Sequence, residues 1–150
     1  MSRLCLIRSS LTLLIAAALA QGVMAGQSVP FKGSFDAIIT AESGPPDATD
    51  ITAVATGNAT HMGRTTAVLD YVFNGLLDTF AGTAVLTAAN GDTLNVSFAG
   101  QQLPDGTLEG SLTFEGGTGR FTDAIGSGDF SGFTPFDGTF SFTIDATISY

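Results

Sequence analysis

The chain has 150 residues, a formal net charge of −9, one cysteine and no tryptophan. A hydrophobic content of 44% with twelve phenylalanines excludes an intrinsically disordered chain, because such chains lack the apolar residues that build a core. Five basic residues against fourteen acidic ones leave no cationic surface for phosphate, so we expect no nucleic acid partner.

Residues 1–25 have the pattern of a secretory signal peptide. A basic start ends at Arg8, an apolar stretch follows, and the small Ala25 suits cleavage before Gly26. The apolar stretch is short for a bilayer span and no stop-transfer pattern follows, which disfavours an uncleaved membrane anchor. We therefore expect a secreted or periplasmic protein with one mature domain, residues 26–150. Three basic residues would remain in it against all fourteen acidic ones, a formal charge of −11.

The single cysteine, Cys5, lies within this predicted signal. The mature domain would then contain no disulfide, no thiol nucleophile and no thiolate metal site. Packing and backbone pairing alone must hold such an exported domain together. This favours a closed β-sheet over a small loop-rich scaffold.

Apolar and polar residues alternate along most of the mature chain, which is typical of half-buried β-strands. In the C-terminal run, for example, Phe142 and Ile144 share one face and Thr143 lies on the other. Turn pairs such as Asn90-Gly91 separate the runs at hairpin spacing. We predict eight strands, at residues 31–40, 51–61, 65–73, 79–88, 93–99, 107–114, 127–134 and 139–150.

Short connections between consecutive strands favour an all-β, antiparallel, up-and-down arrangement. Eight such strands close into a barrel whose interior is filled with side chains or holds one small ligand, and a two-sheet sandwich is the alternative. The glycine-rich residues 116–126 predict a tight turn and one helical turn before the seventh strand, with Phe121 and Ile125 plugging one end of the barrel. A phosphate loop is excluded there, since no Walker lysine follows.

Two short motifs carry a family resemblance. Residues 116–126, Gly-Gly-Thr-Gly-Arg-Phe-x-x-Ala-x-Gly, resemble a turn of the allene oxide cyclase and dirigent barrel superfamily. Residues 59–64, Ala-Thr-His-Met-Gly-Arg, are similar to a segment of its small exported bacterial members. The resemblance implies an eight-stranded antiparallel barrel with a largely apolar cavity. It also implies an isomerase or cyclase, or a dirigent-like protein, that acts on an oxidised lipid, polyketide or phenolic compound.

Two side chains are candidates for acid–base chemistry. His61, the only histidine, follows a face of small residues and would act as a general acid or base at the barrel rim, or else remain solvated beside the turn. Tyr71 and Tyr150 place phenols on apolar faces, where a hydroxyl orients a ligand oxygen or bonds to the backbone. We select His61 and Tyr71 as the catalytic candidates. With one histidine and no facing carboxylate pair, we expect no metal site and no cofactor.

The inward apolar face favours a cavity that encloses a small hydrophobic molecule. Its predicted ligand contacts are Phe35, Leu69, Phe73, Phe98, Phe114, Phe142 and Ile144. A structural or interaction domain, as a monomer or an oligomer, and an outer-membrane barrel are the alternatives. Membrane insertion is disfavoured because two tyrosines and no tryptophan cannot form aromatic girdles, and most predicted strands are shorter than a tilted span needs.

Overall fold

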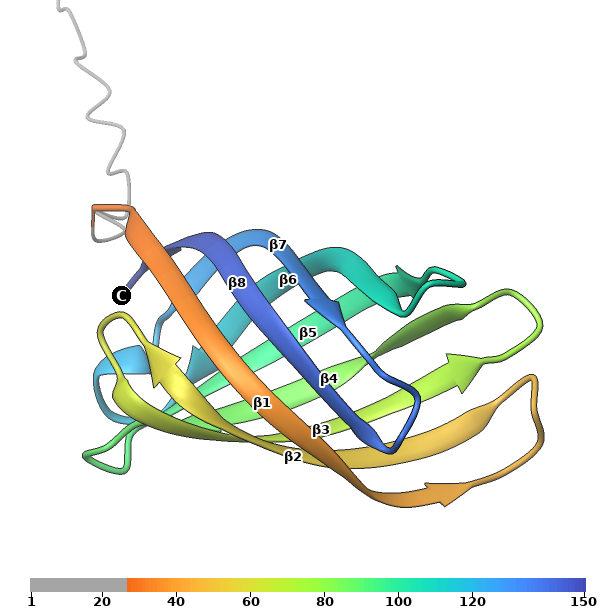
Figure 1. Cartoon of the computed structure of the whole chain (residues 1–150). Helices are drawn as coiled ribbons and strands as arrows, with labels where there is room; N and C mark the ends of the chain where they lie inside the picture. Colours follow the sequence, from red (N-terminus) through yellow and green to blue (C-terminus); the bar gives the residue numbers. More distant parts are fainter. Residues whose placement is uncertain (1–26) are drawn as a thin grey trace, which may run out of the picture.

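A computed structural model describes residues 27–150, so the predicted signal peptide lies outside the described residues. Eight antiparallel strands form one sheet, and the last strand pairs with the first to close a barrel (Figure 1). The elements are β1 (Val29–Ser43), β2 (Thr49–Ala59), β3 (Gly63–Asn74), β4 (Thr79–Thr87), β5 (Thr93–Gln102), β6 (Thr107–Gly117), the 3₁₀ turn η1 (Gly119–Phe121), β7 (Ile125–Phe133) and β8 (Thr139–Ser149). The predicted up-and-down barrel with one short helical turn before the seventh strand is confirmed, and the sandwich alternative is wrong.

Several strands extend beyond their predicted ends. The first strand continues past a register shift after Ile39 as far as Ser43, and β6 continues to Gly117. Gly116 has a φ of +75°, in the left-handed region, and lies where the pairing of β5 with β6 shifts. A glycine that is typical of turns thus lies within the paired part of β6, because a β-bulge accommodates its left-handed conformation without ending the strand.

The connections alternate between the two ends of the barrel. One end carries the β1–β2, β3–β4, β5–β6 and β7–β8 connections, and we name it the open end. The closed end carries the other three connections together with the start of β1 and the end of β8 (Figure 1). Large apolar side chains there are almost inaccessible to solvent: Phe31, Leu94, Phe114, Phe121 and Ile148. The closed end is therefore the packed core of the barrel.

The η1 turn plugs this closed end with a single aromatic ring. Phe121 is 0% exposed, its ring centroid lies 5.1 Å from that of Tyr150, and the Arg120 guanidinium lies 4.9 Å above its face. The predicted plug by Phe121 is confirmed. The same prediction for Ile125 is wrong, because this residue begins β7 on the outward parity, pairs with Glu115 and is 56% exposed.

Glycines on the inner face lie opposite aromatic residues of the neighbouring strands. Gly82 pairs with Tyr71 on one side and Phe98 on the other, and Gly110 pairs with Phe130. A Cβ atom at Gly110 would lie 2.6 Å from Cζ of Phe130, and one at Gly82 would lie 2.5 Å from Cβ of Tyr71. These glycines therefore leave the space in which the rings pack along the barrel wall.

Candidate functional site: an apolar cavity at the open end

The open half of the barrel contains a cavity of about 290 Å³. Aliphatic side chains form its floor toward the closed end, among them Ala67, Leu86, Val96 and Leu112. Nine aromatic residues also line the cavity: Phe35, Tyr71, Phe73, Phe80, Phe98, Phe130, Phe136, Phe140 and Phe142. The cavity opens to solvent at the hairpin connections, where Phe136 is 61% exposed.

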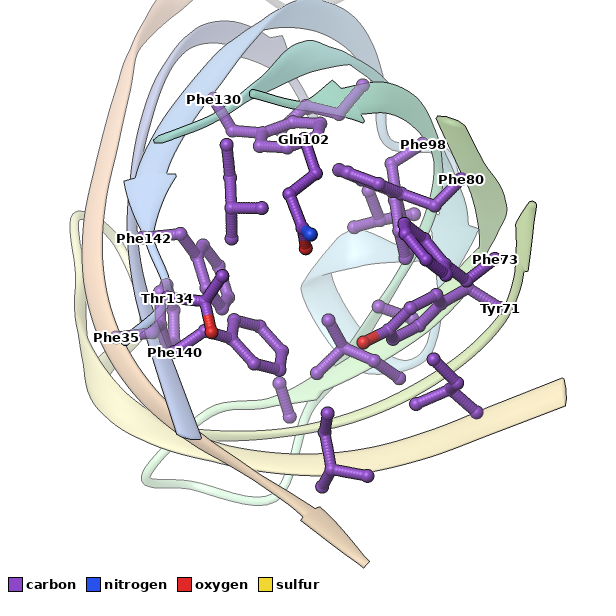
Figure 2. Close-up of a pocket in the computed structure, with 18 of the residues that line it drawn as sticks. Phe35, Tyr71, Phe73, Phe80, Phe98, Gln102, Phe130, Thr134, Phe140 and Phe142 are labelled. Atoms are coloured by element: carbon purple, nitrogen blue, oxygen red, sulfur yellow. The ribbon is translucent and has the colours of Figure 1, made fainter. Parts of the chain in front are cut away.

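The aromatic rings form two walls with a free lumen between them (Figure 2). On one wall, Tyr71, Phe80, Phe98 and Phe130 make a continuous cluster with centroid separations between 5.9 and 6.2 Å. On the other wall, the Phe142 ring stacks on Phe35 at 5.1 Å and on Phe140 at 6.0 Å. Because these rings already pack on one another, they hold the walls apart without filling the lumen.

Four polar side chains lie among the cavity-lining residues: Glu42, Tyr71, Gln102 and Thr134. The Thr134 hydroxyl donates to the carbonyl oxygen of Thr139 at 2.9 Å, so it is already engaged with the backbone. The Gln102 amide points into the lumen from the mouth (Figure 2). A ligand in the cavity therefore has an amide, a phenol and a carboxylate within its surroundings.

The Tyr71 hydroxyl also points into the lumen (Figure 2). Burial raises the pKa of this phenol to about 12, and the negative charge of Glu42 adds to the effect. The phenol is therefore protonated over the whole physiological range. It can donate a hydrogen bond to an oxygen or nitrogen of a bound molecule, but it is not poised to act as a base at neutral pH.

Six of the seven predicted ligand contacts line the cavity, namely Phe35, Leu69, Phe73, Phe98, Phe142 and Ile144. Phe114 instead packs in the closed end, edge-on to Phe31 at a centroid separation of 4.9 Å, and is 2% exposed. The parity that selected Phe114 gave the correct face of its strand, but it carried no information on depth along the barrel axis.

The structure separates the two catalytic candidates. Tyr71 lines the cavity, whereas His61 lies in the β2–β3 connection at the closed end. His61 is exposed, its Nε2 donates to the Pro30 carbonyl oxygen at 2.9 Å, and its ring lies 5.6 Å from that of Tyr150. Its φ of +68° shows that this residue belongs to the turn rather than to the inward face of β2. The two side chains therefore cannot contact one bound molecule in the cavity.

Sequence reasoning did not select Phe80, Phe130 or Phe140 as ligand contacts, yet all three line the cavity. Phe140 shares the face of Phe142, so that signal was present. Phe130 was harder to find because the inward positions beside it, Gly128 and Gly132, carry no side chain and hide the alternation of β7. Glycine at every second position of β7 is the signal that could have identified its inner face.

Two further observations concern the described residues. Within residues 27–150 no group of three or more His, Cys, Asp or Glu side chains is placed to hold a metal ion. No helix in that same range is long and apolar enough to cross a membrane.

The fold and the cavity together define a closed, eight-stranded antiparallel barrel with an apolar lumen open at one end. Among solved structures, that of the pterocarpan synthase dirigent protein GePTS1 is similar, with a TM-score of 0.61 over 83% of this chain and 90% of that chain. The sequence identity is 14%, so the likeness concerns the fold. No family model matches the sequence, and no curated protein matches it.

Proposed function

We propose that this protein is an exported barrel that binds a small hydrophobic molecule in its cavity. The observation that carries the proposal is the cavity itself, about 290 Å³ of mainly apolar space that is closed at one end and open at the other. That volume is near the lower limit for pockets that hold small ligands, roughly 300–1,000 Å³. A domain without disulfides gains stability from a filled interior, so a space of this size supports a role in binding.

Fluorescence of the neutral probe N-phenyl-1-naphthylamine tests the proposal. We expect the probe to bind the wild-type barrel and to bind Gln102→Trp about tenfold more weakly or not at all, because the indole would occupy the mouth. Gln101→Trp is the matched control, since Gln101 is exposed on the outer wall. Absence of probe binding to the wild type, or equal binding by the two variants, would contradict the proposal.

A second candidate function is that of an isomerase, a cyclase or a dirigent-like protein acting on an oxidised lipid, polyketide or phenolic compound. It is favoured by the Tyr71 hydroxyl, a protonated donor inside an apolar cavity, together with the dirigent-type fold. Such a site would work by holding the substrate in one conformation and excluding water, while the phenol bonds to a substrate oxygen.

The Tyr71→Phe variant tests this second function, and His61→Ala is its control because His61 lies at the other end of the barrel. The substrates would be a panel of oxidised lipids, polyketides and phenolics, with rate and product stereochemistry measured by chiral chromatography. We expect the phenol to contribute about tenfold or more to the rate. Equal rates for Tyr71→Phe and the wild type would remove tyrosine from the mechanism.

The proposal includes export without insertion into a membrane. Charged side chains lie exposed along the outer wall of the strands, among them Lys32, Asp36, Asp70, Asp129 and Asp145. Ionised side chains on a lipid-facing wall would each cost up to several kcal/mol, about 2–4 for a lysine at mid-depth. We expect recovery from the soluble exported fraction without detergent. Recovery only with membranes, or only from the cell interior, would contradict this part of the proposal.

A further inference from the structure

Ionised side chains are divided unequally between the two ends of the barrel. Each of the four connections at the open end carries one aspartate, and two more carboxylates lie at the adjoining strand ends: Asp47, Asp78, Asp105 and Asp137, with Glu42 and Asp50. The basic residues of the described chain, Lys32, Arg64 and Arg120, lie in early β1, at the start of β3 and in η1, all in the closed half. Within residues 27–150, the mouth of the cavity is therefore ringed by carboxylates with no neighbouring cation.

Hydrogen bonds hold two of these carboxylates in the ionised form. Asp105 accepts a hydrogen bond from the backbone N–H of Thr107 at 2.9 Å, which lowers the pKa of its carboxyl. Asp137 accepts from the hydroxyl of Thr139 and from its backbone N–H at 3.0 Å, and its pKa is lowered for the same reason. These two turns therefore favour negative charge at the mouth of the cavity.

One carboxylate of this ring also lines the cavity. Glu42 is the only ionised side chain among the lining residues, and its charge acts on the Tyr71 phenol inside. Glu42 pairs with Ile51, which in turn pairs with Tyr71, so the carboxylate and the phenol lie in one row across β1, β2 and β3. Phe136 and Phe140 also line the cavity. Aromatic faces attract cations through the ring quadrupole, and this attraction grows where water is excluded. A carboxylate that lines an aromatic cavity is a combination that favours a positively charged group.

We propose that the cavity selects an apolar molecule with one positively charged group, such as an alkyl or aryl amine. Its body would lie among the rings and its ammonium at the mouth beside Glu42. The inference rests on the proposed binding function and names the class of ligand. A carboxylate of the same size would meet repulsion from the whole ring of acidic side chains, so it would be rejected by charge although its apolar body fits.

Three compounds of one chain length test the inference, namely octylamine, 1-octanol and octanoate, as competitors of N-phenyl-1-naphthylamine at pH 7 and low ionic strength. We expect octylamine to displace the probe at about tenfold lower concentration than octanoate, with 1-octanol between them. In the Glu42→Gln variant, the preference for octylamine over 1-octanol should fall about threefold. Glu115→Gln, the same change on the outer wall, should lose none of it.

The outcomes separate this inference from the binding function on which it rests. If the probe does not bind the wild-type barrel, the binding function itself is wrong. If the probe binds but octanoate competes as well as octylamine, binding stands and the charge selection is overturned. If Glu42→Gln and Glu115→Gln behave alike, the assignment to Glu42 is overturned. Glu42 is exposed, and circular dichroism would verify that its variant retains the fold.

Discussion

Replacement of Phe121 by alanine removes the ring that plugs the closed end. The side chain is 0% exposed and packs on Tyr150, and a Phe→Ala change at a buried site costs roughly 3–5 kcal/mol. This is a large part of the roughly 5–15 kcal/mol that a domain of this size has in total. We therefore expect a fall in melting temperature of roughly 10–20 °C.

Urea unfolding followed by circular dichroism measures the effect, with Phe136→Ala as the matched control. Phe136 is 61% exposed at the mouth, so its loss should change the free energy of unfolding by less than about 1 kcal/mol. Below its melting temperature, Phe121→Ala should still bind N-phenyl-1-naphthylamine, because this ring does not line the cavity. Equal urea midpoints for the two variants would refute the view that the closed end carries the stability of the barrel.

Three further predictions concern the Tyr71 phenol, the inner glycines and the N-terminus. Below pH 10 the Tyr71 phenol is protonated in both the folded and the unfolded chain, so its raised pKa does not change the free energy of unfolding. As pH rises from about 10 to about 12, the free energy of unfolding should fall, because only the unfolded chain loses the proton. Ultraviolet titration of a Tyr150→Phe variant isolates this phenol, and a midpoint near 10 would contradict the expectation. Gly110→Ala should destabilise by roughly 1–3 kcal/mol in urea, since the new Cβ would overlap the backbone carbonyl oxygen of Ala99, which cannot move aside as a side chain can. The outward Ser111→Ala should change little. Mass spectrometry of the exported protein should find Gly26 as its first residue, and an intact N-terminus would contradict the predicted cleavage.

The fold could be predicted because each strand carries its own signal. Alternation fixes which residues of a strand face inward, and Gly-containing pairs such as Asn90-Gly91 fix where the chain reverses. The error at Ile125 arose because the helical turn was predicted too long. Ile125 lies four residues after Phe121 and was assigned to the same helical turn, but η1 ends at Phe121 and Ile125 begins β7 on the outer wall.

The site was harder to predict because it depends on position along the barrel axis. A parity pattern is the same at both ends of a strand, so it could not separate Phe98, which lines the cavity, from Phe114, which packs in the closed end. Depth becomes known only when the direction of each strand is combined with the end at which its connection lies. The same information places Tyr71 inside the cavity and His61 at the far end.

The two halves of this barrel perform different physical tasks. The closed half holds the fully buried large side chains, including Phe31 and Phe121, and this packing compensates for the absence of disulfides in the predicted mature domain. The open half retains about 290 Å³ of unfilled space, with exposed or partly exposed residues such as Glu42 and Gln102 at its mouth. Substitutions at the mouth should therefore alter ligand selection at little cost in stability. This division also bears on the substrate classes that the family resemblance implies. An oxidised fatty acid would bring its own carboxylate to the acidic mouth, so the proposed charge selection would favour neutral or cationic molecules over it.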